Sequence, residues 1–442
     1  MEAAKKELIR ALLEQNIIPT KSSIEALEQS KSSFEILFNY DEKFKYRGVN
    51  DFINYWNSRY KKILNFLQAR QELKNIISIG RLFSKEFVSI IGIIRNKIIT
   101  KNGNIIFEIE DPTSCVKVVF NKSSSDYEMA KDCQVDEVVG ISGQYSNKFI
   151  YASKLVLPDI PITSEINSAK ACIAVLSDLH VGSKLFLEKE FQNFISWLKG
   201  DFEYKIDSLN DWSSKITHVF IVGDAVDGVG VYPKQEDELK IKDIYGQYEK
   251  LAEFLSQIPK RIKIILTPGN HDAVELSEPQ VPLKNEFAKA LLKIPNLILL
   301  SNPAMVKIEK VKILCYHGYS YDFFGENVNS IKYSGKNISD RTGDIMRYLL
   351  QRRHLSPSVE ASPKLPLNND YLVINEVPDV FLSGHIHKSV VSNYKGVLIV
   401  TGSCFQAKTK FQEKVGHEPT PCLVPIIDLK TKDVKILDFN KR

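Results

Sequence analysis

Five short apolar runs between residues 170 and 390 of this chain each end in a small polar cluster rich in histidine and aspartate. Their content of Ile, Val and Leu is typical of buried strands. In open α/β sheets, ligands lie beyond the carboxyl ends of the strands, so we expect the five clusters to meet at one edge. The runs are Ala171–Leu176, Val219–Val222, Ile262–Leu266, Val311–Tyr316 and Val380–Leu382.

The stretches between these runs favour helices, because their apolar residues recur at helical spacing. They include Glu188–Lys199, Glu238–Gln257 and Leu283–Lys293. Strands that alternate with helices predict a layered α/β domain over residues 170–442.

The polar clusters contain five of the eight histidines in the chain. A single such histidine is more often a hydrogen-bonding residue than a metal ligand, but five clusters at one sheet edge favour a metal centre. Carboxylate, imidazole and amide groups together suit Mn²⁺, Fe²⁺ or Zn²⁺, and the lack of thiolates argues against a structural zinc site. The candidate residues are Asp178, His180, Asp224, Asn270, His271, Asp272, His317, His385 and His387.

Residues 84–157 contain short strand-like stretches rich in Ile, Val and Phe, with a turn at 101–103. Five strands in this length fit a small barrel, and an OB-fold fits best. Some OB-folds bind single strands and others are scaffolds, and no row of aromatic residues decides between the two here. The stretches are Phe87–Thr100, Asn104–Glu110, Cys115–Phe120, Glu137–Gly143 and Lys148–Leu157.

Residues 1–75 have a helical pattern. A first amphipathic stretch ends at Pro19, and an apolar face runs along Val49–Leu73. The pattern fits either a small helical bundle or a module that docks a partner. Residues 158–169, which are rich in proline and polar side chains, predict a linker between the barrel and the α/β domain.

Composition narrows the class of protein. The net charge of +5 and the pI of about 8.6 tolerate a nucleic-acid partner without demonstrating one. The six cysteines form no C-x-x-C pair, which argues against a zinc ribbon or a disulfide framework. No apolar run is long enough to cross a membrane, and the N-terminus lacks the pattern of a secretory signal. We therefore expect an intracellular protein with no membrane partner.

The order of the polar motifs along the chain is itself informative. D-x-H, G-D, G-N-H-D, H and G-H-x-H follow one another within residues 170–405, and this set resembles the calcineurin-like metallophosphoesterases. The resemblance implies a four-layer αββα sandwich with two divalent ions, expected to be Mn²⁺, with Fe²⁺, Zn²⁺ or Mg²⁺ as alternatives. The implied ligands of the first ion are Asp178, His180 and His387, those of the second are Asn270, His317 and His385, and Asp224 bridges the two.

The same resemblance assigns catalytic or supporting roles to three residues that hold no metal. It implies that His271 stabilises charge on the substrate or protonates the leaving oxygen. Asp272 would orient His271, and Asp227 would support its own loop, although either carboxylate could be purely structural.

An OB-like region directly before a phosphoesterase domain resembles the small subunits of replicative DNA polymerases, and most nearly those of archaeal family D. The resemblance implies a 3′→5′ exonuclease that proofreads single-stranded 3′ ends of DNA for a separate large catalytic subunit. It also implies work with the sliding clamp and a place in the archaeal cytoplasm, at the nucleoid during replication. The matching loop-like segments are Gly228–Pro233, Arg352–Pro357 and Pro419–Pro421 with the following Val424–Pro425.

Two other classes of function fit the same residues. The chain could be an assembly scaffold whose hydrolytic site is vestigial, or a stand-alone phosphodiesterase that acts on a small molecule. The complete set of ligand residues favours an enzyme over a scaffold. The barrel and the helical region argue against a small-molecule hydrolase, which needs neither.

Several features near the motifs have two interpretations each. The aromatic segment Ser320–Phe324 could stack on a terminal base or lie in the core. Basic residues on a predicted helix over Asp340–Arg353 and after Phe405 could contact DNA phosphates or form surface ion pairs. His218 and His417 fit no ligand position, and the role of His354 stays open. The basic residues are Arg341, Arg347, Arg352, Arg353, Lys408, Lys410 and Lys414.

Overall fold

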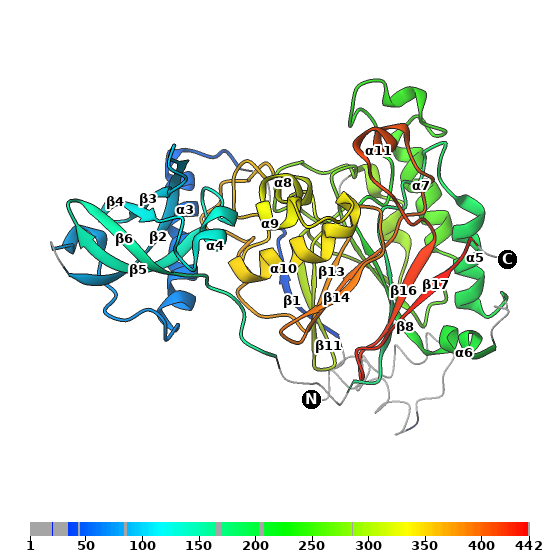
Figure 1. The fold of residues 1–442 in the computed structure, drawn as a ribbon. Helices are drawn as coiled ribbons and strands as arrows, with labels where there is room; N and C mark the ends of the chain where they lie inside the picture. Colours follow the sequence, from blue (N-terminus) through cyan, green and yellow to red (C-terminus); the bar gives the residue numbers. More distant parts are fainter. Residues whose placement is uncertain are drawn as a thin grey trace.

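The computed structural model describes residue 20 and residues 34–42, 45–83, 86–163, 169–202, 207–284 and 286–440. It contains a closed five-stranded barrel and two six-stranded sheets (Figure 1). The first predicted helix, before Pro19, lies outside the described residues. No helix of the described segments is long and apolar enough to span a lipid bilayer.

The barrel contains the five predicted strands. Its strands close in the order β2-β3-β4-β6-β5, in which β4 and β6 run parallel and the other pairs antiparallel. Alternate residues of each strand point inward, and Phe107 and Phe120 pack at its centre. The elements are β2 (Phe87–Ile99), β3 (Ile105–Asp111), β4 (Ser114–Phe120), the helix α4 (Tyr127–Asp132), β5 (Val138–Ser146) and β6 (Phe149–Val156).

The first sheet has the order β10-β9-β8-β7-β16-β17. Its four strands β7 to β10 run parallel, and a C-terminal hairpin extends it beside β7. The strands are β7 (Cys172–Leu176), β8 (Ile216–Val222), β9 (Lys263–Thr267), β10 (Leu297–Leu299), β16 (Leu423–Asp428) and β17 (Val434–Asp438).

The second sheet has the order β1-β11-β12-β13-β15-β14, with β12, β13 and β15 parallel. It combines β1, near the start of the described chain, with five strands between residues 304 and 401. The strands are β1 (Phe34–Asn39), β11 (Ala304–Ile308), β12 (Val311–Cys315), β13 (Val380–Ser383), β14 (Val391–Tyr394) and β15 (Val397–Thr401).

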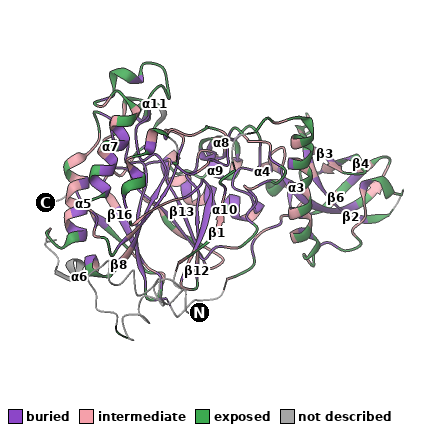
Figure 2. Cartoon of the chain, turned by 180° about the vertical axis from the view of Figure 1, so that it is seen from behind, coloured by how far each residue is buried: buried purple, intermediate pink, exposed green. Residues whose placement is uncertain are grey.

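The two sheets pack face to face, and helices cover their outer faces. Successive residues of a strand point to opposite faces, so Ile173 packs against the second sheet and Ala174 packs under the helices. Figure 2 shows the strands buried and the outer helix faces exposed. The first sheet carries α5 (Glu188–Lys199), α6 (Asp207–Lys215) and α7 (Ile244–Leu255), and the second carries α8 (Tyr321–Asn327), α9 (Asn329–Lys332) and α10 (Thr342–Arg352).

Two predicted elements differ from the structure. Within the predicted helical region, residues 34–39 form β1, which pairs antiparallel with β11 and so belongs to the second sheet. The stretch Leu283–Lys293 forms two 3₁₀ turns, at Glu286–Ala288 and Leu291–Lys293, in place of one helix. In both cases, packing against distant residues overrides a weak local preference.

The helix α3 (Val49–Gln68) joins the barrel to the sheets. Ile63 and Leu67 of this helix pack in a cluster with the barrel residues Val138 and Val156. The α10 side of the sheets is also tied to the barrel, because Arg352 lies 3.3 Å from the Glu137 carboxylate. The barrel is therefore attached to the sheets by buried apolar and ionic contacts.

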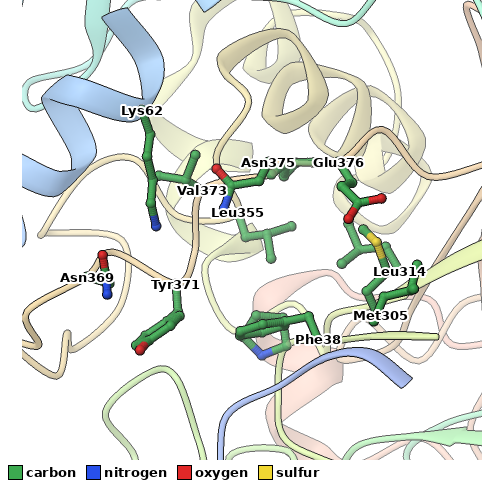
Figure 3. A pocket seen from close by; sticks show the side chains of 13 residues that line it. Phe38, Lys62, Met305, Leu314, Leu355, Asn369, Tyr371, Val373, Asn375 and Glu376 are labelled. Atoms are coloured by element: carbon green, nitrogen blue, oxygen red, sulfur yellow. The ribbon is translucent and has the colours of Figure 1, made fainter. Parts of the chain in front are cut away.

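A cavity of about 300 Å³ lies beside β1 and α3 (Figure 3). Its walls come from the edge of the second sheet, from α3 and from the loop over residues 369–376. None of the candidate metal residues lines this cavity, so it is separate from the polar site at the strand ends. The labelled walls include Phe38, Lys62, Met305, Leu314, Leu355, Tyr371 and Val373.

Candidate metal centre

All five predicted polar clusters meet where the carboxyl ends of β7, β8, β9, β12 and β13 come together. Hydrogen bonds donated by backbone N–H groups join clusters that are far apart in sequence. The Asp178 N–H donates to the Gly223 carbonyl at 3.0 Å, and the His385 N–H donates to the Asp178 carboxylate at 2.9 Å. The site is therefore built between the two sheets, with residues from both.

The first candidate group consists of Asp178, His180 and His387. One ligand atom from each lies within 4.8 Å of the others. The Nε2 atoms of His180 and His387 are 3.1 Å apart, and His387 Nε2 is 3.4 Å from Asp178 Oδ1. These three residues are the ones that the sequence predicted for the first ion.

The second candidate group consists of Asp224, His317 and His385. His317 Nε2 lies 3.3 Å from Asp224 Oδ2 and 3.0 Å from Asn270 Oδ1. Asp224 Oδ2 also lies 4.0 Å from His180 Nε2 of the first group. The structure thus places Asp224 between the two groups and brings all seven predicted ligands together.

The backbone around the site adopts unusual conformations. Five of the seven predicted ligands have φ values in the left-handed region, between 50° and 70°. Such a conformation costs about 1–3 kcal/mol per residue and is concentrated at functional sites in proteins. The five residues are Asp178, His180, Asp224, His385 and His387.

Glycine at position 269 is required by close approach rather than by its backbone angles. A Cβ atom there would lie 2.2 Å from Asp224 Oδ1 and 2.8 Å from His317 Nε2. Any larger residue would push apart the groups that the two sheets bring together.

Burial and neighbouring charges separate the two central carboxylates. Burial raises the pKa of Asp178. Burial acts on Asp224 in the same sense, but His317 and His271 hold the pKa of Asp224 well below its ordinary value. Burial alone would lower the pKa of His317, but the nearby Asp224 carboxylate raises it to about 10. The centre thus has a strongly ionised carboxylate at its middle.

The donor set fits divalent cations. Asp178 Oδ1 is buried and has no hydrogen-bond donor among the described residues, an arrangement that a cation would satisfy. The His317 Nδ1–H donates to the Val222 carbonyl at 3.0 Å, which leaves Nε2 free to bind a metal. Carboxylates, imidazoles and an amide oxygen make these groups able to hold divalent metal ions.

The structure holds His271 by a different partner from the predicted one. Its Nδ1 lies 2.8 Å from the backbone carbonyl of Asp227. The Asp272 carboxylate instead accepts backbone N–H groups of Gly269 and Ala225 and the Tyr248 hydroxyl. Burial raises the pKa of Asp272 to about 7. Asp272 therefore braces two loops of the site, and the orienting contact to the His271 ring comes from Asp227.

Gln412 and Asp322, which support the site, were missed in the sequence, whereas Asp227 was expected only to support its own loop. The Gln412 side-chain amide lies 2.9 Å from His387 Nδ1, and Asp322 Oδ2 lies 3.3 Å from His385 Nε2. Asp227 Oδ1 lies 3.2 Å from His180 Nδ1. Such partners orient metal-binding histidines. The T-x-x-Q capping box at Thr409 was a readable signal for Gln412, whereas the Asp322 contact depends on tertiary packing.

The other predicted features have mostly structural positions. Tyr321 and Phe324 are buried in the core over the second sheet. Arg353 is buried and donates to the carbonyls of Ile374 and Asn375. His354 Nε2 lies 2.8 Å from Asp370 Oδ2, in a fully buried pair. Arg341 and Arg347 pair with acidic neighbours at the surface.

Two histidines that fit no predicted ligand position lie at different distances from the site. His417 Nε2 is 3.8 Å from Asp322 Oδ1, at the edge of the metal centre. His218 is remote from it, in β8, where its ring stacks on Phe34 with centroids 5.8 Å apart. The Thr217 hydroxyl contacts Nδ1 of His218. The buried Nε2 of His218 has no hydrogen-bond partner among the described residues.

His218 gives the folded protein a specific sensitivity to acid. Burial, and then Lys263, lower its pKa to about 3, against roughly 6.5 in an unfolded chain. As the pH falls from 6 to 4, the unfolded chain takes up a proton that the folded protein excludes, so stability is lost by up to about 1.4 kcal/mol per pH unit. His218→Leu is expected to remove this slope. Urea unfolding of both proteins across this pH range measures the difference, and parallel curves would contradict it.

Comparisons with known proteins identify the family of this chain. Residues 173–392 match the family model of the B-subunits of DNA polymerases alpha and epsilon. The DNA polymerase II small subunit of Methanothermobacter thermautotrophicus is 37% identical over 411 residues, which cover 92% of this chain and 83% of that protein. The small subunit from Archaeoglobus fulgidus is 38% identical over 406 residues, with 91% and 80% covered. The chain belongs to the family of archaeal DNA polymerase II small subunits, which confirms the family resemblance seen in its motifs.

The alignment with one solved structure, a novel archaeal phosphodiesterase, covers 60% of this chain and 98% of the phosphodiesterase chain, with 16% sequence identity. The TM-score of 0.29 is too low for a comparison of the two folds.

Proposed function

We propose that this chain is a metal-dependent 3′→5′ exonuclease that proofreads for the DNA polymerase of which it is a subunit. The observation that carries the proposal is the meeting of seven potential ligands, from five strand ends, in two adjoining groups. Two ions held side by side suit hydrolysis of a phosphodiester. A scaffold without catalysis would not need strained backbone at five of these positions.

The proposed ligand assignment follows the two groups. Asp178, His180 and His387 would hold one ion, and Asn270, His317 and His385 the other, with Asp224 between them. We expect Mn²⁺ at both positions. When bound, the ions would neutralise charge on the phosphate and activate water for attack.

His271 is the residue proposed to act on the substrate. Because its Nδ1 donates to the Asp227 carbonyl, its free nitrogen is Nε2. Burial lowers the pKa of His271, so the ring is poised to be neutral until a phosphate comes close. The anionic substrate would favour the imidazolium form, whose Nε2–H could donate to the leaving 3′ oxygen. Asp272 would act on the loops that hold this ring.

The arrangement of the barrel and the sheets supports the proposed domain layout. The barrel order, with an antiparallel meander, a helix between β4 and β5 and a parallel β4–β6 pair, supports an OB-fold over residues 84–157. Helices outside two facing sheets support an αββα phosphodiesterase domain over residues 170–442, joined through 158–169. β1 adds a strand from the N-terminal region, 1–75, to this domain.

The family implies the proposed setting. A small subunit requires a large catalytic subunit, which we propose as the partner. Single-stranded 3′ ends of DNA are the proposed substrate, and the sliding clamp is a proposed associate. The proposed location is the archaeal cytoplasm, at the nucleoid during replication.

The full chain with Mn²⁺ is expected to shorten single-stranded or mismatched 3′ ends, and EDTA should stop the reaction. His271→Gln is expected to lower the rate by about 10²–10⁴-fold, because general acid–base groups contribute that much. Its bound manganese should match that of the unchanged protein, since His271 is not a proposed ligand. Timed gel assays with metal analysis provide both measurements.

His218→Leu is the matched control, because His218 is another buried histidine that is remote from the metal centre. It should retain full activity at neutral pH. Equal losses in both variants would point to instability rather than catalysis. Turnover of small diesters without any effect on DNA would replace the proposal with a small-molecule phosphodiesterase.

A further inference from the structure

A short helix beside the metal centre carries a large aromatic side chain on its outer surface. Phe411 lies in α11 (Lys410–Val415), and 69% of its surface is exposed. The adjacent residue Gln412 is buried and contacts Nδ1 of His387. Phe411 therefore directly precedes the residue that contacts His387, a proposed metal ligand.

The start of α11 is firmly fixed. The Thr409 hydroxyl accepts the Gln412 N–H, and the Gln412 side chain accepts the Thr409 N–H, which together form a capping box. The same Gln412 side chain thus anchors the helix and contacts His387. An exposed apolar residue alone needs no explanation, but this one is held in place at the edge of a site.

The surroundings of Phe411 are basic. Residues 408–416 contain three lysines and one glutamate. Lys408, Lys410 and Lys414 are exposed, and none of them forms an ion pair with another residue of the described segments. In Figure 1, α11 lies beyond one end of the two sheets. Unpaired lysines around an aromatic ring suit a polyanion with flat apolar groups.

A second exposed aromatic residue lies near His271. The Tyr232 ring has its centroid 6.3 Å from that of His271, and 37% of Tyr232 is exposed. Tyr232 belongs to the segment Gly228–Pro233, which follows the Asp224 motif. Tyr232 therefore lies near His271, and the helix that carries Phe411 contacts His387 through Gln412.

We propose that Phe411 is a stacking surface for an unpaired base of the single strand that enters the metal centre, with the nearby lysines neutralising its phosphates. Every base has a flat face that can stack on an aromatic ring, so the contact is independent of sequence. In a duplex, both faces of each internal base are already stacked, so only an unpaired base or the end of a duplex can use the ring. This inference deepens the proposed nuclease function by naming the residue that receives its single-stranded substrate.

Binding of the full chain to a short labelled oligothymidylate, without metal and with EDTA, tests the proposal. Phe411→Ala is expected to weaken binding by roughly 5- to 150-fold, the range typical for loss of one base–aromatic stack. Phe411→Trp should retain binding, and its additional tryptophan fluorescence should be quenched by the bound bases. Phe83→Ala is the matched control, because Phe83 is 68% exposed but precedes the barrel, and it should change binding less than twofold.

Three outcomes would overturn the proposal. The first is equal binding of the single strand by Phe411→Ala and the unchanged protein. The second is an equal loss for a closed circular duplex without ends, which would make the ring a backbone contact. The third is unchanged DNA binding with weakened association of the purified large subunit, which would make it a protein contact.

Failure of this inference can be told apart from failure of the proposed function. Binding is measured without metal, so it does not depend on hydrolysis. A chain that shortens 3′ ends normally but binds DNA equally well with alanine at position 411 would refute only the stacking role. A chain that shows Phe411-dependent binding but no nuclease activity would refute only the enzyme.

Discussion

Asp224→Asn is expected to lower Mn²⁺-dependent shortening of DNA 3′ ends by about 10³-fold or more, because the centre would lose several kcal/mol of charge stabilisation. Asp224 Oδ2 lies 3.3 Å from His317 Nε2 and 4.0 Å from His180 Nε2, so it faces both candidate groups. Asparagine keeps the shape of the side chain. Its oxygen can still accept the backbone N–H of His271, which Asp224 Oδ1 accepts at 2.8 Å in the unchanged protein. Gel assays of 3′-labelled and 5′-labelled strands measure the loss.

Bound manganese should fall together with the activity, which distinguishes this variant from His271→Gln. Asp201→Asn is the control, because Asp201 is an exposed aspartate just after α5, remote from the carboxyl ends of the strands. It should leave both activity and metal content unchanged. Persistent nuclease activity in Asp224→Asn would identify a contaminating enzyme and remove the basis of the assignment.

Arg59→Met is expected to cost about 3–5 kcal/mol of unfolding free energy, as breaking one partner of a buried ion pair does. Arg59 and Asp370 are both fully buried, with Arg59 Nε 2.7 Å from Asp370 Oδ2. Arg59 also donates to the Tyr55 hydroxyl and to the Pro357 carbonyl. Although burial opposes it, His354 and Arg59 hold the pKa of Asp370 well below its ordinary value. The variant would leave this buried carboxylate without the guanidinium, with only His354 and the Leu372 N–H as partners.

Arg95→Met is the matched control, because Arg95 and Glu110 form an ion pair at 3.7 Å with side chains 60% and 44% exposed. Exposed pairs contribute only about 0–1 kcal/mol. Guanidinium unfolding midpoints, in EDTA, compare the two variants. A loss below 1 kcal/mol for Arg59→Met would show that α3 is held by its apolar contacts alone. Adding Asp370→Leu should restore part of the loss, since it removes the unpaired carboxylate.

Much of the candidate site could be predicted from sequence because its determinants are local. A strand that ends in a polar cluster is encoded within about ten residues, by an apolar run followed by histidine, aspartate or asparagine. The structure brings Asp178, Asp224, Asn270, His317 and His385 together as that pattern required. The barrel strands were predicted for the same reason, since alternation and turn residues are short-range signals.

What the sequence did not reveal depends on contacts between residues far apart. β1 lies in a region that was predicted to be helical. Its strand conformation depends on pairing with β11, which is distant in the sequence. The contacts of the Asp272 carboxylate with the backbone N–H groups of Gly269 and Ala225 could not be predicted, because they form only when both loops fold. A helix prediction over Leu283–Lys293 failed because the segment packs against α7.

By itself, the sequence predicted which side chains meet in the candidate metal centre, which strands carry them and to which family the chain belongs. The tertiary structure alone decided how those side chains are held. The left-handed backbone at Asp178 and Asp224, the contact of Gln412 with His387 and the burial of Arg59 against Asp370 are examples. The physical reason is range: periodicity and motifs act between neighbours, whereas orientation and burial arise only when two sheets and a helix pack around the same centre.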